Sequence, residues 1–388
     1  MIAYNQTWLA NLRLQEILKN DLSKGRISDA EFKAITGKYM VGFFTPGVFA
    51  RIGLFIVTCI VVLFAGGLAA LMASSSNVLV SPGFPVFLGL LSYAGLELMV
   101  NINKHYRSGV DDALLFTTGS LFLAGLFMLF STYNNGSNYA ALFGIAFILS
   151  AVFTLRFADM LTSAACCVSF FAFVYFTWTG FLSFGMATAP FAMMLVSAGV
   201  YWLVCADRNK YINYENCFIV GQIVCLVTLY LAGNYYIIQS LSDDLHGQTN
   251  TAIPFGAFFW AWTIGIPFVY VAFGIKKKDA ILLRVGLLLI IAAALTFRNY
   301  YHILPLDITL TIVGAILLGV AYSMTRYLKT PKHGFTYAEP KEENMMDNLK
   351  VESLLVAESF STPASAPTDS GSKFGGGDFG GGGSSDSF

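Results

Sequence analysis

The sequence predicts an all-α protein: a polytopic integral membrane bundle of about ten transmembrane helices, with a short N-terminal helical hairpin and a disordered C-terminal tail. Of its 388 residues, 56% are hydrophobic and only 12% are charged, about half the charged share of a soluble domain. The apolar residues gather in runs of about 20, the length that crosses a hydrocarbon core about 30 Å thick. These runs lack the period-two alternation of a membrane β-barrel. The composition therefore excludes an ordinary soluble domain.

Residues 1–50 are expected to form a cytoplasmic helical hairpin. Apolar residues recur at helical spacing up to Leu22, and Gly25 is placed to end the first helix. Ser28 and Glu31 form a capping box that starts the second helix. A unit this small must pack on the membrane surface, the bundle or a partner. It is therefore either a structural lead-in to the first span or a docking module.

Ten apolar stretches within residues 51–323 are long enough to span a membrane as helices. They are Ile52–Ala73, Gly83–Ile102, Ala113–Ser131, Asn138–Phe157, Leu161–Trp178, Ala189–Ala206, Cys217–Ile238, Phe255–Ile275, Ala280–Phe297 and Leu304–Ser323. Asp111, Asp112, Asp159 and Asp279 precede three of these stretches, where helix capping explains them.

The basic residues predict the orientation of the spans. Of the 23 Lys and Arg residues, 21 lie in the N-terminal segment, in alternate connections and in the tail. Arg284 lies inside the ninth stretch, and Arg298 is the remaining one, on the opposite side. The positive-inside rule then predicts that both termini are cytoplasmic. Basic and acidic residues are equal in number, at 23 each, so the net charge indicates no nucleic-acid partner.

Residues 324–388 are expected to form a cytoplasmic, disordered tail. Their Pro, Ser, Thr and Gly content cannot bury enough apolar surface to fold. The end of the tail is a low-complexity Gly/Ser segment in which Phe374, Phe379 and Phe388 are spaced along the chain. It is either a solvated tail or a recognition segment for a partner.

Two segments carry a family resemblance. Leu22–Phe32 reads LSKGRISDAEF and Tyr106–Leu115 reads YRSGVDDALL. Followed by multiple spans, they resemble a bacterial family of predicted membrane proteins, domain of unknown function 2157, which likewise opens with a short Gly-x-Ile-Ser hairpin. The resemblance covers about the first third of the chain. It implies a protein of the bacterial inner (cytoplasmic) membrane and supplies no activity or catalytic residues.

Two charged side chains inside spans form a candidate intramembrane ion pair. Glu97 lies about 10 Å inward from Lys104, and Arg284 lies about 9 Å inward from Lys278, at 1.5 Å of rise per residue. The two side chains therefore share a depth, and each is costly there alone. The alternative is that Arg284 snorkels to the interface while Glu97 is hydrated or protonated.

Two further features are candidate sites. Gly265 and Pro267 in the eighth stretch form a candidate helix break that exposes backbone carbonyls to a cavity, or else a simple kink. An outer-face polar cluster is formed by Arg298, His302, Asp307, Asp243, Asp244 and His246. In that cluster the single arginine either pairs locally across its connection or receives an anionic headgroup or solute.

The sequence contains no phosphate-binding loop, metal-ligand motif or nucleophile elbow, so no cofactor or metal is expected. The favoured function is non-enzymatic transport or sensing of a small molecule or lipid. The alternatives are a membrane scaffold acting through its cytoplasmic termini and a membrane-embedded enzyme acting on a lipid-linked substrate. Expected partners are the lipid bilayer, a small-molecule or lipid ligand, and a cytoplasmic protein bound through residues 1–45 or the tail.

Overall fold

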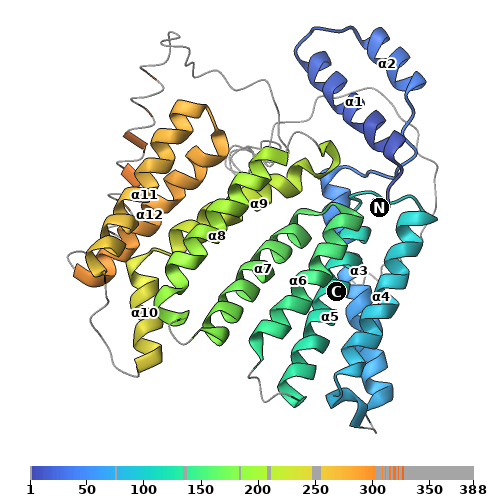
Figure 1. The fold of residues 1–388 in the computed structure, drawn as a ribbon. Coiled ribbons are helices and arrows are strands. Elements are labelled where there is room, and N and C mark those ends of the chain that lie inside the picture. The colour runs from blue at the N-terminus through green and yellow to red at the C-terminus, as the bar shows by residue number, and fades with distance from the viewer. Residues whose placement is uncertain are drawn as a thin grey trace, which may run out of the picture. The chain divides into compact units, whose positions relative to one another are not determined.

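The computed structural model describes residues 2–301, except 75–76, 134–137, 183–184, 208–210 and 247–254, together with individual positions between 308 and 326. The described secondary structure is helical, with one isolated parallel bridge between Phe44 and His105 (Figure 1). The helices are α1 (Gln6–Ser23), α2 (Asp29–Lys38), α3 (Val48–Ala73), α4 (Gly83–Asn101), α5 (Val110–Tyr133), α6 (Tyr139–Phe157), α7 (Met160–Phe181), α8 (Gly185–Asp207), α9 (Glu215–Leu231), α10 (Tyr235–His246), α11 (Gly256–Lys277) and α12 (Ala280–Tyr301), with short 3₁₀ helices η1 (Asn77–Val80) and η2 (Ile212–Tyr214).

Nine helices in the described part of the chain are long and apolar enough to cross a membrane: α3 to α9 and α11 to α12, with η2 joined to the start of α9. This confirms the predicted class, a helical protein with membrane-spanning helices. Most of the tenth predicted span, Leu304–Ser323, and nearly all of the predicted tail lie outside the described residues. The N-terminal hairpin belongs to the same compact unit as the spans, Met1–Met324.

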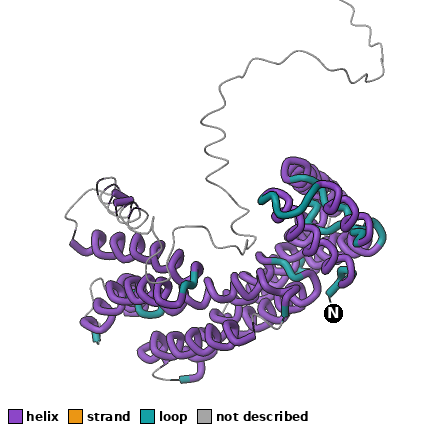
Figure 2. The backbone as a smooth tube through the Cα atoms, turned by 90° about the horizontal axis from the view of Figure 1, so that it is seen from above, coloured by secondary structure: helices purple, strands orange, loops and turns teal. Residues whose placement is uncertain are grey.

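The spans after α3 form four antiparallel helix pairs in chain order: α4–α5, α6–α7, α8–α9 and α11–α12. Helix α3 packs on α5, α7 packs on α8 and α9, and α9 packs on α11 and α12. In Figure 1 the ends of α4, α6, α8 and α11 lie at the end of the bundle nearest α1 and α2, which we call the hairpin end. Figure 2 shows the same helices from above.

Two connections at the hairpin end are tight turns of the same design. After α6, Ala158 adopts the left-handed conformation at φ 50°, and Asp159 caps α7. After α11, Lys278 does the same at φ 56°, and Asp279 precedes α12. Each aspartate accepts from backbone N–H groups two and three residues on, at 2.8 and 3.0 Å for Asp159 and 2.9 and 3.4 Å for Asp279. The capping role predicted for these two aspartates is confirmed.

The seventh span is shorter than the apolar run that predicted it. Helix α9 ends at Leu231, and the side chain of Asn234 accepts from the N–H groups of Tyr236 and Ile237 to start α10. Gly233 lies where a Cβ would be only 2.3 Å from Trp262 of α11. Helix α10 then continues to His246, beyond Ile238, the predicted end of that span. The prediction of one continuous span was wrong because apolar residues continue on both sides of the end of α9. Only packing against α11 marks where that helix ends.

Burial inside the described bundle is sparse for so apolar a chain. One cluster of buried residues joins α4, α5 and α6 with Tyr4, and another joins α9, α11 and α12. None of the most apolar 18-residue window of α3 is buried. In a membrane the lipid is as apolar as a leucine side chain, so helix faces need no protein cover. The exposed apolar faces therefore support the membrane assignment.

Candidate functional site

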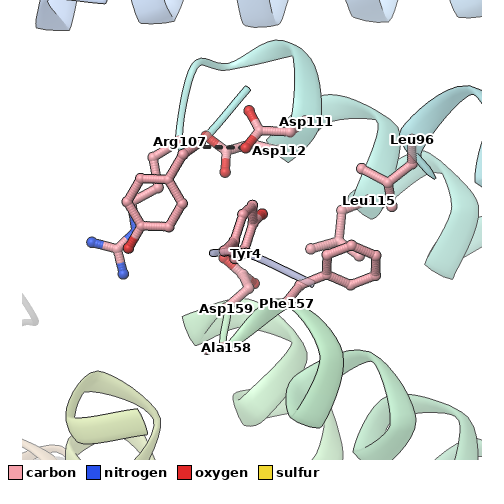
Figure 3. Close-up of a pocket in the computed structure, with 10 residues that line it drawn as sticks. Tyr4, Leu96, Arg107, Asp111, Asp112, Leu115, Phe157, Ala158 and Asp159 are labelled. Carbon is pink, nitrogen blue, oxygen red and sulfur yellow. Dashed lines mark hydrogen bonds between the residues drawn. The ribbon is translucent and has the colours of Figure 1, made fainter. Parts of the chain in front are cut away.

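A small pocket lies at the hairpin end, where the N-terminal segment meets the bundle (Figure 3). Its walls come from the start of α5, the α6–α7 turn and the connection after α4. The residues that line it are Tyr4, Leu96, Tyr106, Arg107, Asp111, Asp112, Leu115, Phe157, Ala158 and Asp159. Figure 3 shows Tyr4 between the aspartates of α5 and the Ala158–Asp159 turn. We call this place the N-terminal junction.

Tyr4 attaches the N-terminal segment to the bundle. Its side chain is 9% exposed, and its ring centroid lies 4.8 Å from Tyr106 and 6.4 Å from Phe157. The N–H of the preceding residue, Ala3, donates to the carbonyl of Arg156 at 2.8 Å. The following residue, Asn5, caps α1. The entry to α1 is therefore tied to the end of α6 by both a ring and a backbone hydrogen bond.

The environment of Tyr4 favours its neutral form. Burial raises the pKa of Tyr4 well above its ordinary value, and the nearby carboxylates of Asp111 and Asp112 raise it further, against a smaller lowering by Arg107. Burial also raises the pKa of Tyr106. Both phenols therefore stay neutral at physiological pH, and neither is poised to act as a base.

Asp111 closes the connection between α4 and α5. Its side chain is 3% exposed and accepts from the N–H of Arg107 at 2.7 Å, the N–H of Ser108 at 2.8 Å and the hydroxyl of Ser108 at 2.9 Å. The same hydroxyl lies 2.7 Å from Nδ1 of His105. Asp111 thus stabilises a connection that includes residues with a left-handed backbone conformation, and both of its carboxylate oxygens already accept hydrogen bonds.

Asp112 connects α5 to α3. Its Oδ2 accepts from Nε of Arg51 at 3.0 Å and from Nη2 at 2.6 Å. Beside this pair, Gly109 has φ +92°, and a Cβ there would lie 2.1 Å from the carbonyl oxygen of Arg51. The glycine permits both the left-handed conformation and the close approach of α3. This ion pair therefore positions the first span, whereas the sequence had predicted only a capping role for Asp112.

Glu97 is paired with Arg156, not with Arg284 as expected. Its oxygens accept from Nε and Nη2 of Arg156 at 2.6 and 2.7 Å, from the hydroxyl of Tyr93 at 2.7 Å and from Nδ2 of Asn101 at 2.6 Å. These four hydrogen bonds saturate the carboxylate. The equal depth of Glu97 and Arg284 in the membrane had suggested their pairing. The ends of α4 and α6, which carry Glu97 and Arg156, meet at the hairpin end. Arg284 instead lies in α12, which packs on α9 and α11.

The predicted helix break in α11 is absent. The helix is continuous from Gly256 to Lys277, with Gly265 inside it and Pro267 fully buried. A proline removes one backbone N–H, and close packing around the ring allows the helix to continue through it.

The predicted outer-face cluster is described only in part. Asp243, Asp244 and His246 lie on α10, where Asp243 accepts from Nε2 of Gln239 at 2.8 Å, and Arg298 lies in the last turn of α12. The start of α10 packs against that turn, with the rings of Tyr235 and Tyr300 5.1 Å apart. His302 and Asp307 lie outside the described residues, so the pairing of Arg298 with Asp307 stays a prediction.

Buried amide side chains in a span and next to one were also missed. Asn234 donates to the hydroxyl of Tyr230 at 2.9 Å and to that of Thr296 at 3.1 Å, which joins α9 to α12. In α9, Gln222 is 4% exposed; its Nε2 donates to the sulfur of Cys205 at 3.2 Å, and its Oε1 has no hydrogen-bond partner among the described residues. The signal in the sequence was an amide within an otherwise apolar run.

The described residues contain no group of three or more His, Cys, Asp or Glu side chains arranged to hold a metal ion. Comparisons of the chain with protein-family models, with curated proteins and with solved structures find no match. The family resemblance therefore stays a prediction.

Proposed function

We propose that this is a non-enzymatic integral membrane protein whose N-terminal hairpin, α1 and α2, is a docking module for a protein partner. The observation that carries the proposal is the N-terminal junction, where Tyr4 is buried among residues of α5, α6 and the connection after α4. A segment that only led into the first span would need no such attachment ahead of α1.

The hairpin is held at a second place and leaves its own faces open. Arg13 of α1 donates to the carbonyl of Ile212, just before α9, at 2.8 Å. Neither α1 nor α2 contains a buried residue, and the apolar side chain of Ile17 is 55% exposed. A module attached firmly at its base and exposed along its helices is suited to binding a partner close to the membrane.

The state of the carboxylates supports a non-enzymatic role. Four acidic side chains near the N-terminal junction, Asp111, Asp112, Asp159 and Glu97, already accept structural hydrogen bonds or an ion pair. General acid or base catalysis needs a group that is free to exchange a proton with a substrate.

The hairpin end is proposed to face the cytoplasm of a bacterial cell, with ten spans in the inner membrane. Support comes from the basic residues, because Lys104, Arg107, Arg156 and Lys276–Lys278 all flank connections at this end. A reporter fused after Lys278 should give a cytoplasmic signal, and one fused near Asp244 a periplasmic signal. The reverse pattern would overturn the orientation.

The docking proposal is tested by photo-crosslinking in the native membrane. A benzophenone amino acid is placed at Ile17 or Lys33, one on each helix of the hairpin. We expect a discrete protein adduct from both positions, which weakens when Tyr4→Ala releases the hairpin and persists with Tyr4→Phe. The absence of protein adducts from both positions would refute a docking module.

A second candidate is transport or sensing of a small molecule or lipid, favoured by the side-chain oxygen of Gln222, which has no hydrogen-bond partner among the described residues. A buried acceptor without a donor is costly, and a bound ligand could supply that donor. Thermal unfolding of the purified protein with a panel of lipids and solutes tests this. A ligand that stabilises the wild type but not Gln222→Leu would support the candidate, and a panel without effect would count against it.

A further inference from the structure

The segment Met40–Phe49, which we call the strap, comprises the link from α2 to α3 and the first two residues of α3, and it exposes a run of apolar side chains. Met40 is 72% exposed, Phe44 48%, Val48 67% and Phe49 84%. Val48 and Phe49 begin α3, whose exposed face is suited to lipid, but Met40 and Phe44 lie outside the spans, so the exposure of these two side chains needs an explanation.

Hydrogen bonds and packing hold the strap in place, so its apolar side chains are exposed on an ordered segment. The N–H of Phe44 donates to the carbonyl of Lys104 at 3.0 Å, and Nδ2 of Asn11 donates to the carbonyl of Met40 at 2.9 Å. At Gly42 a Cβ would lie 2.6 Å from the ring of Trp8. One side of the strap is therefore packed on α1 and bonded to the connection after α4, which leaves the other side open.

The open side is continuous with the surface that the spans present to lipid. The strap runs directly into α3, and it passes the end of α4, where Ile102 is 68% exposed. Basic residues flank the patch. Lys38 is exposed, with its ammonium 5.9 Å from the ring centroid of Tyr39, and Lys104 is exposed beside Phe44. Apolar and aromatic groups bordered by lysines at helix ends are typical of a membrane interface.

We propose that the strap lies in the headgroup layer of the leaflet at the hairpin end. Its apolar side chains enter the boundary with the acyl chains, and Lys38 and Lys104 bind the phosphates of anionic phospholipids. Lys104 already donates one hydrogen bond to the carbonyl of Asn101, which leaves two of its three donors for a headgroup. The strap then holds the base of the hairpin at the membrane surface. This inference stands whether or not the hairpin binds a partner.

Photo-crosslinking of the full-length protein tests insertion. The benzophenone amino acid replaces Met40, Phe44 or, as the control, Ile17, which is also apolar and exposed but lies on α1. The protein is placed in nanodiscs of mixed phosphatidylcholine and phosphatidylglycerol, and adducts are measured by mass spectrometry. We expect phospholipid adducts from Met40 and Phe44 and none from Ile17. Absence of lipid adducts from both strap positions, or an equal yield from Ile17, would overturn the proposal.

The headgroup contact is tested in the same nanodiscs. We compare the double variant Lys38→Gln/Lys104→Gln with Lys19→Gln/Lys24→Gln, which removes two exposed lysines from α1 and its C-terminal cap. The ratio of phosphatidylglycerol to phosphatidylcholine adducts should fall by about fivefold per strap lysine, because one basic residue near an anionic surface contributes about 1 kcal/mol. The control should leave that ratio unchanged. Equal effects of the two variants would overturn the assignment of the headgroup contact to Lys38 and Lys104.

Discussion

Replacing Tyr4 by alanine should release the N-terminal segment while the spans stay folded. The ring is 9% exposed and contacts Tyr106, Phe43 and Phe157, at centroid distances of 4.8, 6.1 and 6.4 Å. Truncation of a buried aromatic side chain to alanine costs about 3–5 kcal/mol. We use the lower end of this range, about 3 kcal/mol, because the N-terminal junction lies at the end of the bundle. At about 1.4 kcal/mol per tenfold change, the segment should open roughly a hundredfold more often.

Hydrogen exchange measured by mass spectrometry on the protein in nanodiscs gives the local opening. Amides of α1 should exchange roughly a hundredfold faster in Tyr4→Ala, whereas amides of α6 and α7 should change little. Tyr4→Phe keeps the ring contacts and should exchange like the wild type. Unchanged exchange of α1 in the alanine variant would refute the junction as its anchor. An equally large effect of the phenylalanine variant would show that the hydroxyl, and not the ring, holds the segment.

Three further predictions follow from hydrogen bonds, backbone geometry and pKa. Glu97→Gln and Arg156→Leu should each lower the melting temperature, and the double variant should lose less than the sum, because the charge left alone is the costly state; strictly additive losses would contradict the pair. Gly109→Ala should destabilise the fold by at least about 2 kcal/mol in denaturant titration, since it strains the left-handed backbone and clashes with α3, and a variant of wild-type stability would disprove that contact. Hydrogen bonds from the backbone and side chain of Ser28 lower the pKa of Glu31, so the capping box contributes its stability above the ordinary carboxyl pKa and loses it as the pH falls through the lowered one. Amide exchange in α2, corrected for intrinsic rates, should therefore quicken on acidification, and Glu31→Gln should remove that pH dependence.

Features that depend on neighbouring residues could be predicted from the sequence. Ser28 and Glu31 form the expected capping box, and Gly25 follows α1 in the left-handed conformation, at φ +67°. Asp159 and Asp279 cap the helices that they precede. Helix caps are made within a few residues of chain, so the sequence carries nearly all the information they need.

Contacts between distant segments could not be predicted. Depth in the membrane favoured Arg284 as the partner of Glu97, and only the meeting of α4 and α6 showed that the partner is Arg156. The end of α9 at Leu231 was hidden because apolar residues continue past it, and the boundary depends on Gly233 packing against Trp262. Tyr4 carried no signal of burial, since a tyrosine before a helix is ordinary.

Composition and hydropathy by themselves determined that this chain is a helical membrane protein, because every backbone polar group in lipid must be satisfied within its own helix. The residues next to each helix start also determined the starts that a nearby Ser or Asp caps. The tertiary structure decided which charges pair, where the apolar runs are divided, and that the segment around Tyr4 belongs to the bundle. Lipid and protein interior are equally apolar, so hydropathy cannot distinguish a helix face that meets lipid from one that meets another helix.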